Sequence, residues 1–394
     1  MNEHKYNQAL VTPLIKWPGG KSKEFQYFSE LIPKFKRYIE PFFGGGGVFF
    51  RLQPSCALIN DKCDELAQFY RYIRGEEGGK LFAENLREYV SIWREAGEIS
   101  KSSMIMLKSI YFSIDARSPD EAAVLEKIDK FFLKFKSLFE SLSDRKICLS
   151  PATLKEEIKN SLYEKLLRTA KLELEKGKIS DEDLEKNIET GIRGGVYMYF
   201  RGLMNELRKS NLKHLPLKIA NYYFVREFCY GSMFRFNSSG DFNIPYGGIA
   251  YNDKDFSGKV EHLLSKEVHG LFKNTEVGSE DFEAFLLRAE ISADDFVFLD
   301  PPYDTDFSAY ENSEFGKSDQ ERLAKFLLNT EAKFMLVIKN TPFIHSLYDG
   351  KKGINIAAFD KKYLYNVRGR NDRQVEHLII FNYEAPQLAK RIHE

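Results

Sequence analysis

Cysteine is scarce in this sequence of 394 residues, and its spacing suits neither a metal site nor a disulfide framework. The four cysteines are Cys56, Cys63, Cys148 and Cys229, and they form no CxxC pair and no cluster with histidine. We therefore expect reduced thiols, as in the cytoplasm, and neither a zinc site nor any other metal centre.

Long apolar runs are also missing. Residues 1–5 contain no hydrophobic export core, and no stretch approaches the roughly 18 apolar residues that a membrane-spanning helix needs. We expect a cytoplasmic protein with neither an export signal nor a membrane span.

The sequence has no excess of one charge sign. Lys and Arg together number 58, as do Asp and Glu, so the net charge does not indicate binding to nucleic acid. Any such surface must come from local clustering. Hydrophobic residues make up 43% and charged residues 29%, which is typical of a globular protein, and the length favours one large domain with a substantial second one.

A short apolar run followed by two prolines is the most informative stretch of the chain. Residues 296–299 predict a buried strand, which Pro301 and Pro302 end because neither can donate to a ladder. Asp300 and Tyr303 then lie at the carboxyl end of a strand, where open α/β sheets bind ligands. The Asp300 carboxylate and the Pro301 carbonyl are acceptors that could hold both hydrogens of one planar amino group, and Tyr303 offers a ring for stacking.

Two glycine-containing segments indicate a nucleoside-type ligand near the amino terminus. Residues 14–21 contain Pro-Gly-Gly between Lys16 and Lys21, which suits either a small carboxylate or a plain surface turn. Residues 37–50 predict a strand, a turn with four glycines and a helix. No Gly-Lys-Ser/Thr follows, so this is not a P-loop.

Residues 57–61 predict a second strand that ends in an acid. Asp61 follows the apolar run directly, a position at which an acid can accept both hydroxyls of a ribose. The alternative is that Asp61 caps the helix expected over 65–73.

The middle of the chain predicts amphipathic helices. Residues 81–96, 121–142 and 154–176 place apolar residues at three- and four-residue spacing, with breaks near 118–119 and 150–151. Their mixed charges indicate solvated faces. Contact with DNA, contact with a partner protein, or no contact all stay open.

A basic segment follows, from Arg201 to Arg235. Its seven cations are Arg201, Arg208, Lys209, Lys213, Lys218, Arg226 and Arg235, against Glu206 and Glu227. The aromatic residues interleaved with them are Tyr222, Tyr223, Phe224, Phe228 and Tyr230. Cations beside aromatic rings are what DNA binding requires, although a basic helix beside a core strand gives the same pattern. Residues 230–247 then predict a β-hairpin with its turn at 237–240.

In this order, the motifs resemble those of the group-alpha, Dam-like DNA adenine-N6 methyltransferases. Residues 16–21 resemble the amino-terminal cofactor motif, residues 40–46 the FxGxG motif, and residues 300–303 the catalytic motif. The resemblance covers residues 1 to about 75 and about 230 to 383, and not the middle. It implies S-adenosylmethionine as cofactor, and the residues it assigns to the cofactor are Trp17, Lys21, Phe42, Phe43, Gly44, Gly46, Asp61, Phe282 and Asp300.

The resemblance also implies residues that contact DNA. Residues 235–247 resemble the family's hairpin signature, and residues 368–381 resemble a last motif, a basic loop followed by an edge strand. The residues implied to contact DNA are Tyr230, Met233, Arg235, Asn237, Asn243, Arg368 and Arg373. Arg235 could bind a guanine edge or a phosphate. Gly231 and Ser232 stand where Dam carries Asn-Gly, so the target sequence stays open.

Three further segments lie around the catalytic motif. Residues 272–282 resemble the third cofactor strand, at whose end Phe282 either stacks on the cofactor adenine or packs in the core. Residues 306–310 resemble a loop that folds over the active site. Beyond it we expect a helix over 320–328 and strands over 334–338 and 363–367.

We expect a Rossmann-like α/β methyltransferase domain made from both ends of the chain. It comprises residues 1–77 and 260–394, and a mostly helical DNA target-recognition domain, residues 78–259, is inserted and ends in the hairpin at about 230–247. Because the cofactor half precedes the insertion and the catalytic half follows it, neither half can form the sheet alone.

The expected activity is methylation of the N6 amino group of an adenine flipped out of double-stranded DNA, with Asp300, Pro301, Pro302 and Tyr303 as catalytic residues. N4-cytosine methylation, which usually uses Ser in place of Asp300, and a catalytically silent DNA-binding role in a partner complex are the alternatives. Glutamine methylation usually uses Asn there and is a weaker alternative. The absence of a Pro-Cys segment argues against carbon-5 cytosine chemistry.

The resemblance implies a protein encoded by a bacterium, an archaeon or a phage. We expect a monomer or a weak dimer. A restriction endonuclease counterpart, as in restriction-modification systems, and a second subunit both stay open.

Overall fold

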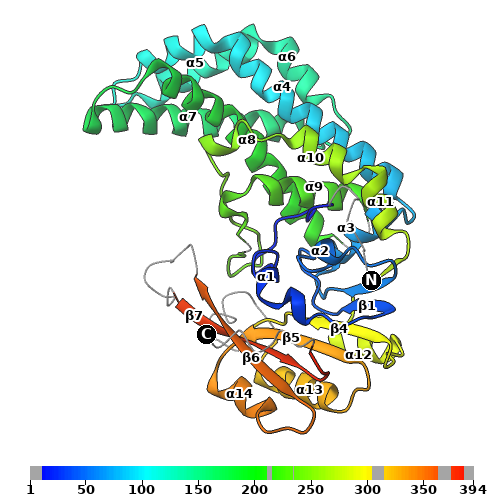
Figure 1. Cartoon of the computed structure of the whole chain (residues 1–394). Coiled ribbons are helices and arrows are strands. Elements are labelled where there is room, and N and C mark those ends of the chain that lie inside the picture. Colours follow the sequence, from blue (N-terminus) through cyan, green and yellow to red (C-terminus); the bar gives the residue numbers. More distant parts are fainter. Residues whose placement is uncertain (1–10, 211–214, 234, 304–314, 363–373, 386–394) are drawn as a thin grey trace. The chain divides into compact units, whose positions relative to one another are not determined.

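One sheet organises the part of the chain that contains the predicted site. The computed structural model describes residues 11–210, 215–233, 235–303, 315–362 and 374–385, and within these ranges seven strands form a sheet in the order β3-β2-β1-β4-β5-β7-β6 (Figure 1). The strands are β1 (Arg37–Glu40), β2 (Ala57–Asn60), β3 (Thr275–Gly278), β4 (Asp295–Leu299), β5 (Lys333–Lys339), β6 (Asn355–Lys362) and β7 (Gln374–Phe381). The predicted α/β fold class is confirmed.

Strand direction places the carboxyl ends of β1, β2 and β4 at one edge of the sheet. The first five strands in this order run parallel, with Ile39 of β1 opposite Leu58 of β2 and Val297 of β4. β7 is antiparallel to both of its neighbours, β5 and β6. Since β1 and β2 come from one end of the chain and the other strands from the opposite end, the sheet needs both segments.

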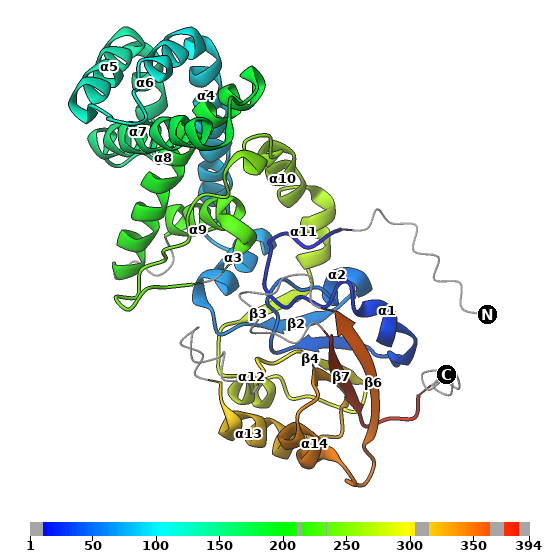
Figure 2. The same ribbon diagram turned by 90° about the vertical axis from the view of Figure 1, so that its left-hand side faces the viewer.

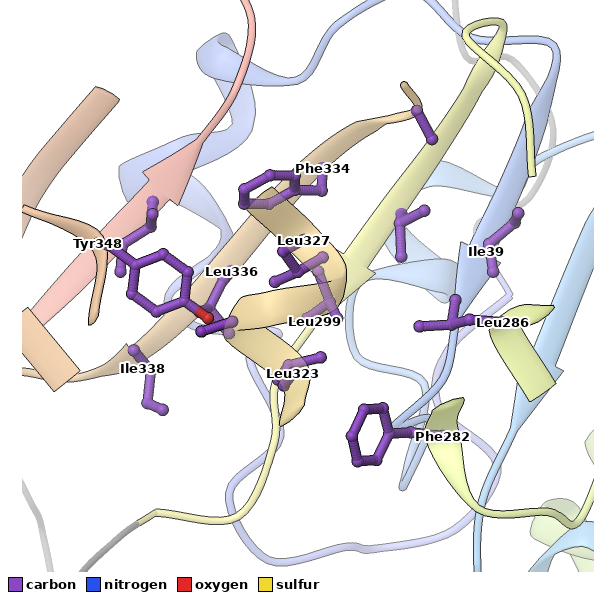
Figure 3. Packing of buried hydrophobic residues seen from close by; sticks show 14 of the residues in the cluster. Ile39, Phe282, Leu286, Leu299, Leu323, Leu327, Phe334, Leu336, Ile338 and Tyr348 are labelled. Atoms are coloured by element: carbon purple, nitrogen blue, oxygen red, sulfur yellow. The ribbon is translucent and has the colours of Figure 1, made fainter. Parts of the chain in front are cut away.

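Residues of the central strands alternate between two helical layers. Val297 and Leu299 pack into a buried cluster with the helices α12 (Phe282–Arg288), α13 (Lys317–Leu328) and α14 (Pro342–Tyr348), and Figure 3 shows Leu286, Leu323, Leu327 and Tyr348 against residues of the sheet. Phe298 faces the other layer, where its ring stacks on Phe28 at 5.6 Å. That layer contains α1 (Phe25–Phe28), α2 (Phe49–Leu52), α3 (Asp64–Arg74) and α11 (Lys266–Phe272), and Figure 2 shows α1 and α2 on the opposite side of the sheet from α12 to α14.

The chain divides into two compact units. One consists of Met1–Arg74 and Ser265–Glu394 and contains the sheet; the other is Gly75–Leu264. The helices of the second unit are α4 (Gly79–Phe112), α5 (Glu121–Lys134), α6 (Lys136–Ser143), α7 (Pro151–Lys176), α8 (Asp181–Lys209), α9 (Pro216–Phe228) and α10 (Phe256–Leu263). The catalytic and target-recognition roles of these units stay predictions.

Local sequence explains how α7 and α8 begin and why they pack closely. Ser150 caps α7 by accepting from the Thr153 amide, with Pro151 at the first helical position, and Ser180 caps α8 in the same way. A Cβ at Gly195 would lie 2.3 Å from the Cα of Ile158, so glycine is what lets α8 approach the backbone of α7.

Three predicted strands need correction or lie outside the described residues. β7 is not an edge strand, because β6 pairs along its outer side. The expected third cofactor strand over 272–282 contains only the four residues of β3, since Phe272 ends α11 and Phe282 begins α12. The strand expected over 363–367 lies outside the described residues. In the described part of the chain, no helix is long and apolar enough to cross a membrane.

Candidate active site

The predicted catalytic segment follows β4 directly. β4 ends at Leu299, and the next residues, Asp300 and two prolines, leave the sheet at its carboxyl edge. Pro301 is buried, Pro302 is exposed, and the Pro302 carbonyl accepts a hydrogen bond of 2.8 Å from the Gln320 side chain of α13. Both ends of this tetrapeptide are therefore held, one by the sheet and the other by a helix.

Lys21 joins the two functional ends of the catalytic segment. Its Nζ forms an ion pair with Oδ1 of Asp300 and donates to the Tyr303 hydroxyl at 3.1 Å. The Lys21 side chain is 1% exposed and that of Asp300 is 18% exposed. A lysine expected to lie beside a cofactor carboxylate is thus buried at the catalytic motif, where it fixes the orientations of Asp300 and Tyr303.

A histidine contacts the same tyrosine from another strand. Nε2 of His377, in β7, lies 3.2 Å from the Tyr303 hydroxyl, and the His377 side chain is fully buried. The His377 ring also stacks on Phe359 of β6, with ring centroids 5.6 Å apart.

The glycine turn after β1 packs tightly against Trp17. Gly44 has a φ of +51°, and a Cβ there would lie 2.6 Å from Cδ1 of the Trp17 indole. Gly46 has a φ of +65°, and a Cβ there would lie 2.5 Å from the ring of Phe43. The turn therefore requires glycine at both positions, and it exposes backbone where a ligand can approach.

Asp61 is tied to this turn from the end of β2. Its Oδ2 accepts from the Gly44 amide at 2.8 Å and its Oδ1 from the Cys63 amide at 2.9 Å. Burial raises the pKa of Asp61, although these two hydrogen bonds oppose that effect. Because α3 begins at Asp64, the alternative of a cap for a helix starting at Glu65 does not hold. Asp61 is only partly buried at the sheet edge, so part of its carboxylate can still contact a ligand.

Glu40, at the end of β1, is a further residue of this edge, and it is not among the residues that the sequence pattern predicts for the site. It is 3% exposed and accepts a hydrogen bond of 2.8 Å from the Tyr38 hydroxyl. Burial raises the pKa of Glu40 well above its usual range, and the charges of Asp300 and Asp61 add to this against the opposing effects of Tyr38 and Lys21. Glu40 thus lies between the predicted cofactor acid and the predicted catalytic acid.

An aromatic cluster borders the predicted cofactor side. The ring centroid of Phe42 lies 5.5 Å from that of Phe282 and 5.4 Å from that of Phe315. Phe282 is 3% exposed and belongs to the core between the sheet and its helices (Figure 3), whereas Phe42 is half-buried. Phe43 is 3% exposed and packs on Tyr70. The core alternative therefore describes Phe282 better than stacking on a cofactor does. Phe43 is equally buried, while Phe42 has surface left for a ligand.

The segment predicted as a hairpin folds back on itself without two continuous strands. Isolated antiparallel bridges join Cys229 to Tyr246 and Phe236 to Phe242. The positive φ values of Gly231 and Ser232, +62° and +52°, interrupt the ladder, as does Pro245. The turn at 237–240 is as predicted, since the Gly240 amide donates to the Asn237 carbonyl.

Most of the predicted DNA contacts in this segment are accessible. The exposed ones are Tyr230, Met233, Arg235 and Asn237, and Asn243 is half-buried. Nε of Arg235 donates to Oδ1 of Asn243 at 3.1 Å. Arg368, Arg373, the loop 306–310 and Lys213 lie outside the described residues.

The part of the basic segment that forms α9 is core, whereas Lys209 and Arg235 on either side of it are exposed. Arg226 is fully buried and donates to the Met233 carbonyl at 2.8 Å. The predicted stacking of its aromatic residues on DNA is wrong for Tyr222, Tyr223, Phe224 and Phe228, which are at most 2% exposed. Every residue of α9 from Lys218 to Phe228 is buried, so these rings lie in the interior of the second unit. Composition alone could not predict this.

Among the described residues, no group of three or more His, Cys, Asp or Glu side chains could hold a metal ion.

Comparisons with known proteins agree on one family. A family profile described as D12 class N6 adenine-specific DNA methyltransferase matches residues 17–132 and 154–363. The type II methyltransferase M.CviBI of Paramecium bursaria Chlorella virus NC1A is 34% identical over 167 residues, which is 42% of this chain and 60% of that protein.

Two relatives are similar over almost their whole length. The type II methyltransferase M.MjaIII of Methanocaldococcus jannaschii is 26% identical over 393 residues, which span 95% of this chain and 99% of that protein. The type II methyltransferase M1.LlaDCHI of Lactococcus lactis subsp. cremoris is 22% identical over 394 residues, with shares of 97% and 99%. The long middle segment is therefore within the region that these two relatives match.

Proposed function

The chain belongs to the D12 class N6 adenine-specific DNA methyltransferase family, and from this premise we propose that it transfers a methyl group from S-adenosylmethionine to N6 of an adenine flipped out of duplex DNA. The observation that carries the proposal is the placement of Asp300 and Tyr303 at the carboxyl edge of β4, beside the glycine turn of β1 and Asp61 of β2. A planar amino group and a cofactor can therefore meet at one edge of the sheet.

The residues at this edge fit S-adenosylmethionine. The turn at Gly44 and Gly46 has no room for side chains, so a ligand meets backbone there, and Asp61 offers a partly buried carboxylate for a ribose. Trp17, against which the turn packs, and Phe42 would border the cofactor. When bound, the cofactor supplies an electrophilic methyl group on sulfur.

The chain's own residues would bind and orient the base. The Asp300 carboxylate and the Pro301 carbonyl would accept the two amino hydrogens, which aligns the nitrogen lone pair for in-line attack. Tyr303 would stack on the flipped adenine. Lys21 keeps Asp300 and Tyr303 at a fixed spacing through its ion pair and its hydrogen bond. Alignment would supply most of the rate, with no covalent intermediate on the protein.

The first test replaces the catalytic acid. We expect Asp300→Ala to lower the rate of DNA methylation at least about 100-fold, because the amino group loses an acceptor that aligns it, while cofactor binding persists in part. The measurement is transfer of labelled methyl groups to unmethylated genomic DNA, with cofactor affinity measured by calorimetry.

A matched control is Asp294→Ala. Asp294 is an exposed acid just before β4 whose only described ion pair is with the exposed Lys36, so methylation should stay near the wild-type rate. Near-normal turnover of Asp300→Ala would contradict the site assignment.

Long-read sequencing of DNA from a methylation-free host that expresses the wild-type protein identifies the modified base, and N4-methylcytosine would contradict the proposed substrate.

A further inference from the structure

Two side chains hold the hydroxyl of Tyr303. Nζ of Lys21 lies 3.1 Å from this oxygen and Nε2 of His377 lies 3.2 Å from it. The lysine approaches from the loop before α1, and the histidine comes from β7, a strand that is not next to β4 in the sheet. The hydroxyl is therefore fixed by parts of the chain far apart in sequence.

The chemistry of Lys21 and His377 determines which atoms donate and which accept at the Tyr303 hydroxyl. An ammonium group can only donate, so the hydroxyl oxygen accepts from Lys21. The hydroxyl hydrogen can then be donated to Nε2 of a neutral His377 whose own hydrogen is on Nδ1. In this arrangement the lysine orders the oxygen and the histidine orders the hydrogen.

His377 itself has a position set by the sheet. Its backbone pairs with Lys339 of β5 on one side and with Phe359 of β6 on the other. Its ring is fully buried and stacks on the ring of Phe359, with an interplanar angle of 27°. The ring of Tyr303 meets it edge-on, at 67° and 5.6 Å.

We propose that His377 is a positioning residue of the methyl-transfer reaction, which acts by holding the far end of the Tyr303 ring in place. The inference rests on the proposed function, in which that ring stacks on the flipped base. A tyrosine held only by its backbone and two prolines can still rotate about its side-chain bonds. A hydrogen bond at the hydroxyl oxygen stops the ring from swinging about the Cα–Cβ bond, and the edge-on contact with the His377 ring limits rotation about the ring axis. A ring held in place in this way aligns the base at no cost during the reaction.

A double-mutant cycle tests the proposal. The four proteins are the wild type, Tyr303→Phe, His377→Phe and the double variant, because Phe keeps an aromatic ring at each position. Tyr303→Phe removes the hydroxyl contacts with both His377 and Lys21, and His377→Phe removes the contact with the hydroxyl from the histidine side. The assay is single-turnover methylation of unmethylated genomic DNA with labelled S-adenosylmethionine. DNA affinity and thermal unfolding are measured in parallel.

We expect each single variant to lower the single-turnover rate about tenfold, the effect of losing roughly one hydrogen bond at the transition state. The single-turnover rate of the double variant should lie within about twofold of the rates of the single variants, because His377 acts only through the Tyr303 hydroxyl. DNA affinity should stay within about threefold of the wild-type value.

His377→Gln is the conservative variant. It also replaces His377→Phe in the double-mutant cycle if Phe at this position destabilises the fold. Its amide oxygen can accept from the Tyr303 hydroxyl, so its rate should lie between those of His377→Phe and the wild type.

A rate for His377→Phe within twofold of the wild type overturns the proposal. A double variant about 100-fold slower, the product of the single losses, also overturns it. If the wild type labels no adenine, the proposed function fails as well; if it does and the cycle is additive, this inference alone fails.

Discussion

Glu40 shows how one residue at the sheet edge links pH to stability. Its pKa is raised by burial, so the folded protein keeps the Glu40 proton at pH values where the unfolded chain has lost it. Between the ordinary pKa of glutamic acid and the raised value, the folded state binds more protons, and its stability falls as the pH rises. Above the raised pKa this loss is complete.

Glu40→Gln removes this dependence. Gln keeps an oxygen that accepts from the Tyr38 hydroxyl and cannot ionise, so we expect the variant to unfold at a higher temperature than the wild type at alkaline pH. The difference should shrink as the pH falls toward about 4.5, and each unit of the pKa shift corresponds to about 1.4 kcal/mol. Thermal unfolding from pH 5 to 9 measures it.

The control for Glu40→Gln is Glu30→Gln, at an exposed position of the same unit. Parallel curves of melting temperature against pH for the wild type and Glu40→Gln would show that Glu40 does not titrate as its burial requires.

Single residues were predictable where local sequence carries the signal. Asp61 and Asp300 were selected because each follows an apolar strand directly, and the structure brings both to the same edge. Glu40 follows an apolar pair in the same way, and the same rule would have selected it. His377 carries no local signal, because its contact with Tyr303 joins positions 74 residues apart.

At the scale of elements, the segment 229–247 depends on α8 for its shape. Asn205 of α8 donates to the Phe242 carbonyl at 3.1 Å and accepts from the Phe242 amide at 2.8 Å, as a neighbouring strand would. The Tyr197 hydroxyl donates to the Ile244 carbonyl at 2.8 Å. Side chains of one helix thus replace the ladder that the segment lacks.

We expect Asn205→Ala to loosen this segment. Leaving the buried backbone groups of Phe242 without their partner costs about 1–3 kcal/mol of unfolding free energy. If the exposed side chains of the segment read DNA, the variant should also methylate sites that differ from the cognate motif, because those side chains are no longer held in register. Long-read sequencing after expression in a methylation-free host reports both motif and off-motif methylation.

Asn187→Ala is the matched control on the same helix. Among the described contacts, the half-buried Asn187 amide donates to the Asp183 carbonyl one turn earlier and makes no bond to the segment 229–247, so the motif and the melting temperature should stay close to those of the wild type. Unchanged motif selectivity in Asn205→Ala would separate this segment from target recognition.

Elements with a strong local pattern were predicted from the sequence. The three segments predicted as helices in the second unit, 81–96, 121–142 and 154–176, are helical, with breaks next to the caps Asp120 and Ser150. The prediction is incomplete, because α4 continues to Phe112, 121–142 is divided between α5 and α6, and α8 was not predicted. The sequence does not predict β6, because Asn355–Lys362 lacks the alternating β-branched residues that mark a strand. Without β6, the neighbouring β7 is expected at the edge of the sheet, and that expectation is wrong. Pairing between strands is a tertiary property, which a single strand does not encode.

For the whole molecule, the family prediction from the order of motifs is confirmed by the profile match over both parts of the chain. The order of the strands explains why those parts must combine. β1 lies between β2, from its own segment, and β4, from the far segment, and the buried cluster that includes Ile39 and Leu58 is otherwise supplied by residues after the insertion.

The points where the chain leaves and re-enters the sheet unit lie side by side. Nδ1 of His269 in α11 is 3.4 Å from the carbonyl of Ile73 in α3. A short flexible linker can therefore join Arg74 to Ser265 in place of Gly75–Leu264. Since the sheet and its core lie wholly within this unit, we expect the shortened chain to unfold cooperatively and to gain thermal stability from S-adenosylmethionine.

The shortened chain should bind cofactor without methylating DNA at a defined motif, because the segment 229–247 is removed with the second unit. Residues 1–74 alone provide a control. They contain only β1 and β2 and should stay unfolded, since a two-stranded fragment buries too little apolar surface. Motif-specific methylation by the shortened chain would place target recognition in the sheet unit, and failure to bind cofactor would show that the second unit completes the cofactor site.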